Sequence, residues 1–135
     1  MYVSETQVRV RYADTDCMTY VYYGNYAYFY EVGRVEALRS LGLSYKLMEE
    51  KGIMLPVFKF NITYFKPAFF DDLLTVRTMI KQLPQARIVF EYEMYNEKNE
   101  LLNKGETTLV FIDRKTNKPC SAPDWVMEKI IPYMK

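Results

Sequence analysis

The sequence predicts a single α+β domain in which a five-stranded antiparallel sheet packs around one long helix. A segment with strand-like alternation comes first, and a long segment with helical periodicity follows it. Four further strand-like segments come next, separated by short turns, which is typical of antiparallel strands. The chain has 135 residues and no linker rich in Ser, Gly or Pro, so we expect one domain over residues 1–135.

The first strand is expected over residues 3–12. Apolar and polar residues alternate there as in a half-buried strand, and the apolar side holds Val8, Val10 and Tyr12. A segment with two aspartates, Asp14 and Asp16, separates this strand from the helix. The strand therefore leads directly into the part of the chain with the most promising carboxylates.

The long helix is expected over residues 24–41. Glu31, Arg34 and Arg39 fall largely outside its apolar face, which holds Tyr26, Phe29, Tyr30, Gly33, Ala37 and Leu41. Gly42 follows at the position where a glycine often ends a helix. Gly33 lies inside the helix at a cost of about 1 kcal/mol relative to alanine. Close approach of the helix to the sheet is the simplest reason for that glycine.

A second, short helix is expected over residues 44–51, with Ser44 as its cap and Gly52 at its end. The remaining strands are expected at residues 57–64, 74–80, 87–94 and 101–113, and a terminal helix at 123–133. Because one helix cannot cover both faces of five strands, we expect part of the sheet or its edge to meet another subunit.

The composition excludes several classes of function. There is no histidine, which removes Ser-His-Asp hydrolysis, Cys-His catalysis and most zinc chemistry. Eighteen basic residues nearly balance seventeen acidic ones, so we expect no nucleic-acid partner. No apolar run approaches the roughly 20 residues of a membrane helix. Cys17 and Cys120 lie far apart and no apolar leader comes first, so we expect free thiols in the cytoplasm.

Two stretches carry a resemblance to a known family. Residues 10–39, VRYADTDCMTYVYYGNYAYFYEVGRVEALR, resemble the entrance of hot-dog-fold thioesterases of the 4-hydroxybenzoyl-CoA thioesterase type, which includes the YbgC-like acyl-CoA thioesterases. The matching residues are Tyr12, Asp14, Thr15, Asp16, Val21, Tyr22, Asn25, Tyr26 and Glu31. Residues 62–76, ITYFKPAFFDDLLTV, resemble a second signature of that family, with a proline and an acidic pair between two strands.

The resemblance implies a reaction and a site. It implies hydrolysis of an acyl-CoA or aroyl-CoA thioester in a homodimer or tetramer, with no metal and no organic cofactor. By the same resemblance Asp16 is the catalytic carboxylate, as nucleophile or as general base, and the backbone N–H of Tyr23 polarises the thioester carbonyl. Free amides at a helix start stabilise a developing oxyanion. YbgC-like members commonly carry histidine at the position of Tyr23, so the branch of the family stays open.

Other residues are candidates for binding the substrate. Tyr22 and Asn25 lie close to Asp16 in the sequence, and Lys59 and Asn61 point away from the apolar face of their strand. Lys81 and Arg87 flank a hairpin where they would meet coenzyme A phosphates. For Asp14 we expect pairing with a nearby arginine. A carboxylate held against this much aromatic surface would also be partly desolvated, and therefore more reactive.

Less specific interpretations remain for the same residues. Asp16 would equally serve as a helix cap or a surface-loop carboxylate, and the tyrosines as core or subunit interface. The rival function is a non-catalytic acyl-CoA-binding or protein-interaction module on the same fold, because a fold does not fix a function. A hot-dog dehydratase is a third possibility, but its usual histidine is missing.

Overall fold

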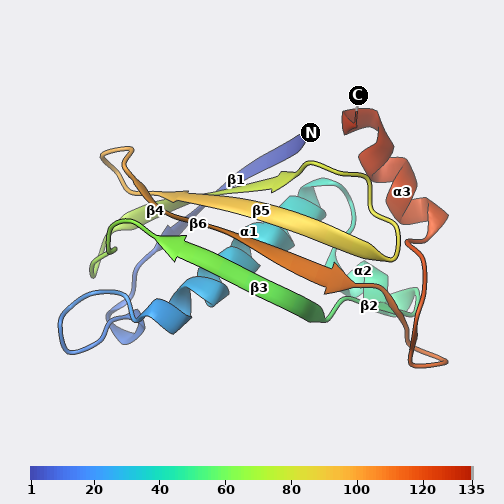
Figure 1. The fold of residues 1–135 in the computed structure, drawn as a ribbon, viewed down its shortest axis with the longest axis horizontal. Helices are drawn as coiled ribbons and strands as arrows, with labels where there is room; N and C mark the ends of the chain where they lie inside the picture. Colours follow the sequence, from blue (N-terminus) through green and yellow to red (C-terminus); the bar gives the residue numbers. More distant parts are fainter. Residues whose placement is uncertain (135) are drawn as a thin grey trace.

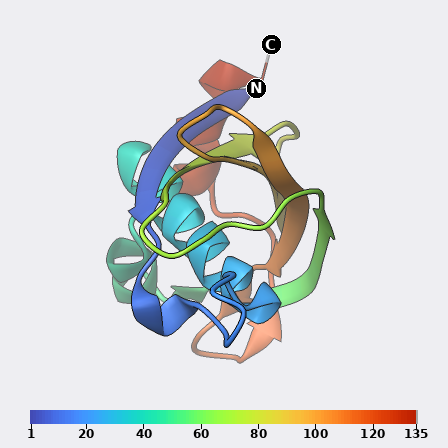
Figure 2. The same cartoon turned by 90° about the vertical axis from the view of Figure 1, so that its left-hand side faces the viewer.

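A computed structural model describes residues 1–134 of the chain. Its main sheet has five antiparallel strands in the order β1-β4-β5-β6-β3. These strands are β1 (Tyr2–Arg9), β3 (Val57–Tyr64), β4 (Leu73–Ile80), β5 (Arg87–Tyr95) and β6 (Leu101–Val110). The long helix α1 (Tyr26–Ser40) crosses the concave side of this sheet (Figure 1), and the strands curve around it (Figure 2). The predicted architecture is therefore confirmed.

The smaller elements close one end of the molecule. They are α2 (Tyr45–Glu50), α3 (Asp124–Ile130), a second sheet of β2 (Ile53–Met54), β7 (Ile112–Asp113) and β8 (Lys118–Pro119), and the 3-10 helix Ile131–Tyr133. Two further 3-10 helices, Tyr12–Asp14 and Tyr23–Asn25, lie between β1 and α1 at the opposite end. Gly42 ends α1 with a φ of 78°, and the Leu47 amide donates to the Ser44 hydroxyl at the start of α2. Both helix boundaries were predicted from these residues.

Two expected strands are shorter than predicted. The last strand, expected over residues 101–113, leaves the main sheet after Val110, because its neighbour β3 begins only at Val57, which pairs with Leu109. The chain then continues as β7 in the second sheet. At the start of the chain β1 ends at Arg9, and Tyr12 lies in a 3-10 helix with 76% of its side chain exposed, so its expected inward position is wrong.

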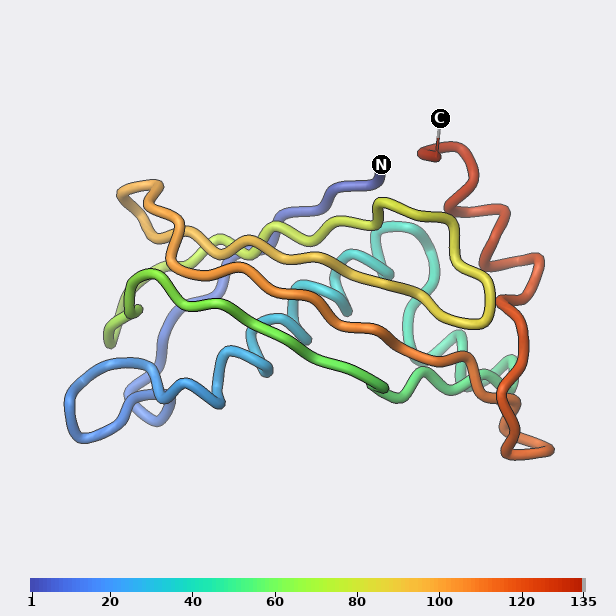
Figure 3. The backbone as a smooth tube through the Cα atoms, in the orientation of Figure 1, coloured from blue at the N-terminus to red at the C-terminus, as the bar shows by residue number. Residues whose placement is uncertain are grey.

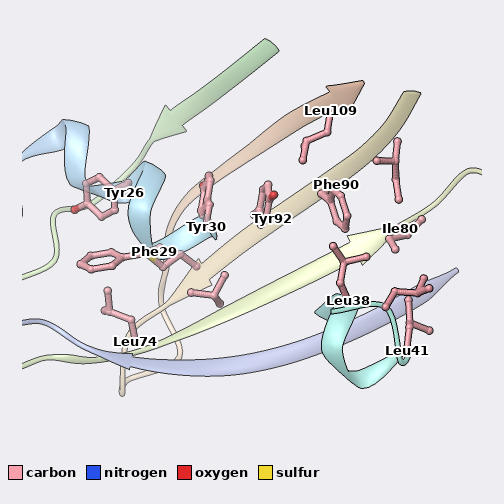
Figure 4. Packing of buried hydrophobic residues seen from close by; sticks show 14 of the residues in the cluster. Tyr26, Phe29, Tyr30, Leu38, Leu41, Leu74, Ile80, Phe90, Tyr92 and Leu109 are labelled. Carbon is pink, nitrogen blue, oxygen red and sulfur yellow. The ribbon is translucent and has the colours of Figure 1, made fainter. Parts of the chain in front are cut away.

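The core lies between α1 and the sheet. The predicted apolar face of the helix is buried as expected, and Tyr30 stacks on Tyr92 of β5 with ring centroids 4.3 Å apart (Figure 4). Arg34 was expected largely outside this face but is buried. Its guanidinium donates hydrogen bonds to the hydroxyls of Tyr45, at 2.8 Å, and Tyr92, at 3.1 Å. These two hydroxyls replace part of the water that the cation loses on burial.

Gly33 marks the place where α1 comes closest to the sheet. A Cβ atom at this position would lie 2.6 Å from Oγ1 of Thr78 and 2.7 Å from Cγ1 of Val76, both on β4. Real Cβ atoms do not approach other atoms this closely, and both neighbours are β-branched and stiff. The close approach predicted from a glycine inside a helix is confirmed.

The substitution Gly33→Ala tests this packing. Alanine improves the helix propensity, but its methyl group forces α1 away from β4, and overpacking of this kind costs about 1–3 kcal/mol. We expect a lower urea midpoint with an unchanged slope, followed by circular dichroism. Val32→Ala, at an exposed position of the same helix, is the control. A Gly33→Ala chain as stable as the wild type would show that α1 and β4 have room between them.

Candidate functional site

The segment between β1 and α1 forms a small hairpin that carries Asp16. Thr15 pairs with Val21, and the Asp16 amide donates to the carbonyl of Tyr20 at 2.8 Å. Thr19 closes the turn with a φ of 66°. A second contact, between Tyr20 and Phe69, attaches the hairpin to the turn before β4. The hairpin lies at one end of the molecule, the end where β3 finishes (Figure 3).

The two oxygens of the Asp16 carboxylate have different surroundings. Oδ1 accepts the amide of Met18 at 2.8 Å, as an aspartate at the start of a tight turn commonly does. Oδ2 accepts no hydrogen bond from the rest of residues 1–134, and no arginine or lysine in that range pairs with it. One oxygen therefore fixes the orientation of the carboxylate, and the other is available to a ligand or a water molecule.

Asp14 is a structural residue, as expected from its neighbouring arginine. Only 5% of it is exposed, and its carboxylate accepts hydrogen bonds from the amide and the guanidinium of Arg11. Burial opposes the charge on Asp14, but the hydrogen bonds and positive charge of Arg11 outweigh it, so the pKa of this carboxyl is lowered. Its main-chain carbonyl accepts the amide of Tyr22 at 3.0 Å and the side-chain amide of Asn25 at 2.8 Å.

Tyr23 begins the 3-10 helix that leads into α1. Within residues 1–134 its amide donates to no acceptor, as is usual for the first residue of a helix. The Tyr22 carbonyl, in the same peptide group as this amide, accepts the amide of Asn25 at 2.8 Å. The next carbonyl along the chain, that of Tyr23, accepts the hydroxyl of Tyr64 at 3.1 Å. The helix start therefore presents an unpaired amide whose position is held from the other side.

Asp16 and Tyr23 line the same cleft. The cleft has a volume of about 440 Å³ and lies between the hairpin, the start of α1 and the segment that follows β3. Its other lining residues are Tyr20, Val21, Tyr26, Tyr64, Phe65, Lys66 and Pro67. Asp16, which has a free carboxylate oxygen, and Tyr23, which has an unpaired amide, thus line one mostly aromatic hollow that is open to solvent.

The aromatic wall is held by hydrogen bonds of its own. Tyr26 is buried, and its hydroxyl accepts the amide of Ala68 at 3.1 Å. Burial raises the pKa of Tyr26 and that of Tyr64, so both phenols stay protonated at neutral pH. The two rings lie 5.5 Å apart and carry no charge into the cleft.

The other predicted binding residues do not all gather at Asp16, and Asn61 and Lys81 instead line a separate shallow hollow on the sheet. The ring of Tyr22 lies beside that of Tyr23, with centroids 4.7 Å apart and planes tilted by 44°, and the Asn25 side chain donates to the Asp14 carbonyl. Lys59 and Asn61 lie on the outer face of β3, away from the cleft.

Lys81 and Arg87 lie at the opposite end of the sheet from Asp16. Lys81 pairs with Glu91 at 3.1 Å, and Arg87 lies 4.3 Å over the ring of Phe58. Within one protomer the structure therefore brings Asp16 together with Tyr23 and places Tyr22 beside Tyr23.

The sequence did not assign Tyr64, Phe65, Lys66 and Pro67 to the site. They belong to the second family-like stretch, yet its spacing gave no sign that the chain returns to the start of α1 there. The expected desolvation of Asp16 is also wrong for a single protomer, because its side chain is exposed. A substrate or a second chain would have to remove that water.

Two kinds of feature are absent from residues 1–134. No helix among them is long and apolar enough to cross a membrane. No group of three Cys, Asp or Glu side chains in the same range could hold a metal ion.

The salt bridge of Asp14 predicts a pH dependence of stability. The lowered pKa means that the ionised carboxylate stabilises the fold above the pKa of the unfolded chain, about 3.9, and that this contribution disappears as the pH falls through the folded value. Asp14→Asn should lower the unfolding midpoint at pH 7 and flatten its fall between about pH 5 and pH 3. Asp16→Asn, in the same loop but without an arginine partner, is the control in thermal melts. Parallel pH curves for the wild type and Asp14→Asn would contradict this role.

Comparisons with known proteins identify the family. The chain matches the Thioesterase-like superfamily over residues 10–130. It is 37% identical to YneP of Bacillus subtilis over 93% of this chain and 94% of that protein. It is 35% identical to the acyl-CoA thioester hydrolase YbgC of Escherichia coli over 86% of this chain and 87% of that protein.

A solved structure agrees with this assignment. The DHNA-CoA thioesterase of Staphylococcus aureus superimposes with a TM-score of 0.91 at 39% identity, covering 98% of this chain and 91% of that one. The hot-dog fold expected from the sequence is thereby confirmed. The chain belongs to the Thioesterase-like superfamily.

Proposed function

We propose that this chain hydrolyses acyl-CoA thioesters to a free acid and coenzyme A, with Asp16 and the Tyr23 amide as its catalytic groups. The relatives named above as thioester hydrolases support the reaction class. The observation that carries the proposal is the single cleft that holds a free carboxylate oxygen of Asp16 and the start of the α1 segment. We further propose the cytoplasm as its location, where cysteines such as Cys17 and Cys120 remain reduced.

The carboxylate has two possible roles in this reaction. As a nucleophile, Oδ2 of Asp16 attacks the carbonyl carbon, the C–S bond breaks, and coenzyme A leaves as a thiolate that takes a proton from solvent. Water then hydrolyses the mixed anhydride on Asp16. As a general base, the carboxylate takes a proton from the attacking water, and the C–S bond breaks in the same way. Both roles need one unpaired carboxylate oxygen, which Asp16 has.

The amide of Tyr23 has the complementary role. Negative charge develops on the thioester oxygen as the carbonyl carbon is attacked, and an unpaired N–H at a helix start stabilises that charge. The Tyr22 carbonyl of the same peptide group is held by the amide of Asn25 at 2.8 Å, so the peptide does not have to reorganise during the reaction. The phenol ring of Tyr23 is 65% exposed and has no necessary part in this step.

A homodimer is the second part of the proposal. Strand β3 is a free edge of the sheet, because it pairs only with β6. Phe60 and Tyr64 meet Tyr30 and Tyr26 of α1 on the concave side and are 41% and 44% exposed. Phe58 lies at a bulge in the strand, under the guanidinium of Arg87, and is 59% exposed. A long apolar edge of this kind normally pairs with another strand. The outer face of the sheet instead carries cross-strand ion pairs, for example Arg77 with Glu93, and suits solvent.

Antiparallel pairing of β3 with β3 of a second copy would cover this edge. The two-fold axis would pass near the middle of the strand, and one continuous sheet would result. It would also bring Lys59, Lys81 and Arg87 of the second protomer to the end of the sheet that carries Asp16. The predicted contacts of these residues with coenzyme A depend on that arrangement.

The rival proposal is a binding module without catalysis, and Asp16→Asn separates the two. The substitution keeps the shape of the side chain and removes its charge, so kcat should fall at least ~100-fold, the scale for a lost general base. KM should change little, as measured with released thiol, and Asp14→Asn should cost less. Full turnover by a folded Asp16→Asn chain would favour the binding module.

Tyr23 allows the amide to be tested apart from the side chain. Tyr22 has φ −59° and ψ 130°, which is compatible with a proline at the next position. Tyr23→Pro deletes the N–H and should lower kcat by roughly 100- to 1,000-fold, whereas Tyr23→Phe should keep most activity. Circular dichroism must show that both fold. Equal activity of the two would eliminate the amide, and an inactive Tyr23→Phe would make the phenol hydroxyl the working group.

The dimer is tested by sedimentation equilibrium at micromolar concentration. The wild type should sediment as a dimer or as a tetramer of dimers. Phe60→Glu should sediment as a monomer, since the two-fold would place two new charges close together in the interface. Ile131→Glu, at an exposed position near the other end of the chain, should not change the mass. A stable and active wild-type monomer would refute this part of the proposal.

A further inference from the structure

A second hollow lies at the opposite end of β3 from the Asp16 cleft. It has a volume of about 310 Å³ and is bounded by α2, β2 and the residues that lead into β3. Its lining residues are Tyr45, Met48, Glu49, Ile53, Met54, Leu55 and Pro56. We call it the α2 pocket. Nothing in the proposed chemistry of a single protomer uses it.

The cleft and the α2 pocket lie on the same side of the strand. Tyr64 ends β3 in the wall of the cleft, where its ring meets Tyr26 of α1. Phe60, in the middle of the strand, meets Tyr30 of the same helix on the concave side. Leu55 and Pro56 lead into the strand from the α2 pocket. The exposed apolar side of β3 thus runs from one hollow to the other.

Antiparallel pairing of two β3 strands brings the α2-pocket end of one strand to the cleft end of the other. The first residues of β3 in one protomer then lie beside the last residues of β3 in its partner. The segment just before Val57, which lines the α2 pocket, falls opposite the segment just after Tyr64, which lines the cleft. If the two-fold axis lay one residue pair further along the strand, these two segments would still lie close to each other. Each cleft therefore meets the α2 pocket of the other protomer.

We infer that the α2 pocket of one protomer binds the acyl chain of the thioester whose carbonyl is held by Asp16 and Tyr23 of the other. This inference rests on the proposed thioesterase function and on pairing through β3. It assigns a binding role to the α2 pocket, and it makes residues of α2 and β2 the determinants of acyl specificity. The site is then incomplete in a single protomer.

The lining of the α2 pocket selects a linear aliphatic chain. Met48, Ile53, Met54 and Leu55 give it an apolar wall, and the flexible thioethers of the methionines adapt to a chain of variable shape. The Tyr45 hydroxyl accepts a hydrogen bond from Arg34. This bond keeps the hydroxyl beside the buried guanidinium of Arg34. Glu49 is exposed and disfavours acyl groups that end in a carboxylate.

Met54→Trp tests the role of the α2 pocket, because a larger side chain fills it. We expect the kcat/KM for dodecanoyl-CoA to fall at least ~10-fold while that for butanoyl-CoA stays within about two-fold, since each lost methylene contact weakens binding. Leu55→Trp is a second filling variant, so a folding failure of one leaves the test intact. Ile131→Trp is the control on an exposed surface. Unchanged dodecanoyl-CoA hydrolysis in a folded filling variant would overturn the inference.

Mixed dimers decide whether the cleft and the α2 pocket belong to different protomers. One chain carries Asp16→Asn and the other Met54→Trp, and two affinity tags isolate the mixed species. If the acyl chain crosses to the partner, one of the two sites keeps both its carboxylate and its open pocket. The mixed dimer should then hydrolyse dodecanoyl-CoA at about half the wild-type rate. Neither the Asp16→Asn homodimer nor the Met54→Trp homodimer should hydrolyse dodecanoyl-CoA at that rate.

The outcomes separate this inference from the function on which it rests. A mixed dimer that hydrolyses butanoyl-CoA but not dodecanoyl-CoA would place the acyl chain in the same protomer as its Asp16, and the inference would be wrong. A wild type that prefers benzoyl-CoA, with Met54→Trp blocking benzoyl-CoA and dodecanoyl-CoA alike, would overturn the aliphatic assignment. A wild type inactive on every acyl-CoA, or an active Asp16→Asn homodimer, would instead reject the proposed function.

Discussion

The main-chain carbonyl of Asp14 holds the hairpin of Asp16 against the start of α1. It accepts the amide of Tyr22 at 3.0 Å and the side chain of Asn25 at 2.8 Å. The Asp14 carboxylate is fixed in turn by Arg11 at the end of the first strand. Because these contacts join the segments before and after the hairpin, they set where its carboxylate and the first helical amide lie. The cleft then owes its geometry to the backbone more than to the side chains that line it.

Features with a local cause could be predicted from the sequence. The 3.6-residue period identified the buried face of α1, because each of its positions is set by near neighbours along the helix. Gly33 and Gly42 were informative for the same reason, since a close approach and a left-handed turn each favour glycine over other residues. The arginine partner of Asp14 lies only three residues away. Asp16 and Tyr23 came from resemblance to a family, and the structure places both in one cleft.

Features that depend on distant segments could not be predicted. The return of Tyr64 to the carbonyl of Tyr23 follows from how β3 lies beside α1, and no sequence period reports it. Arg34 was expected outside the apolar face, but two tyrosine hydroxyls from α2 and β5 make its burial possible. Lys81 and Arg87 lie far from Asp16 within one protomer. The exposed aromatic side of β3 suggests that a second protomer pairs there and brings its own Lys81 and Arg87 nearer. Their predicted role requires a second chain, and the sequence gives no register for that pairing.

In the proposed reaction the Tyr23 amide polarises the thioester carbonyl while Asp16 acts as nucleophile or as general base. Isotope-edited infrared spectroscopy tests this polarisation directly, with a thioester labelled with ¹³C at the carbonyl and bound to the slow Asp16→Asn chain. A hydrogen bond from the amide weakens the C=O bond, so we expect a carbonyl band at lower frequency than that of the free thioester. The band should return toward the free value in the Asp16→Asn/Tyr23→Pro chain. The same carbonyl frequency in both variants would show that the Tyr23 amide does not polarise the carbonyl.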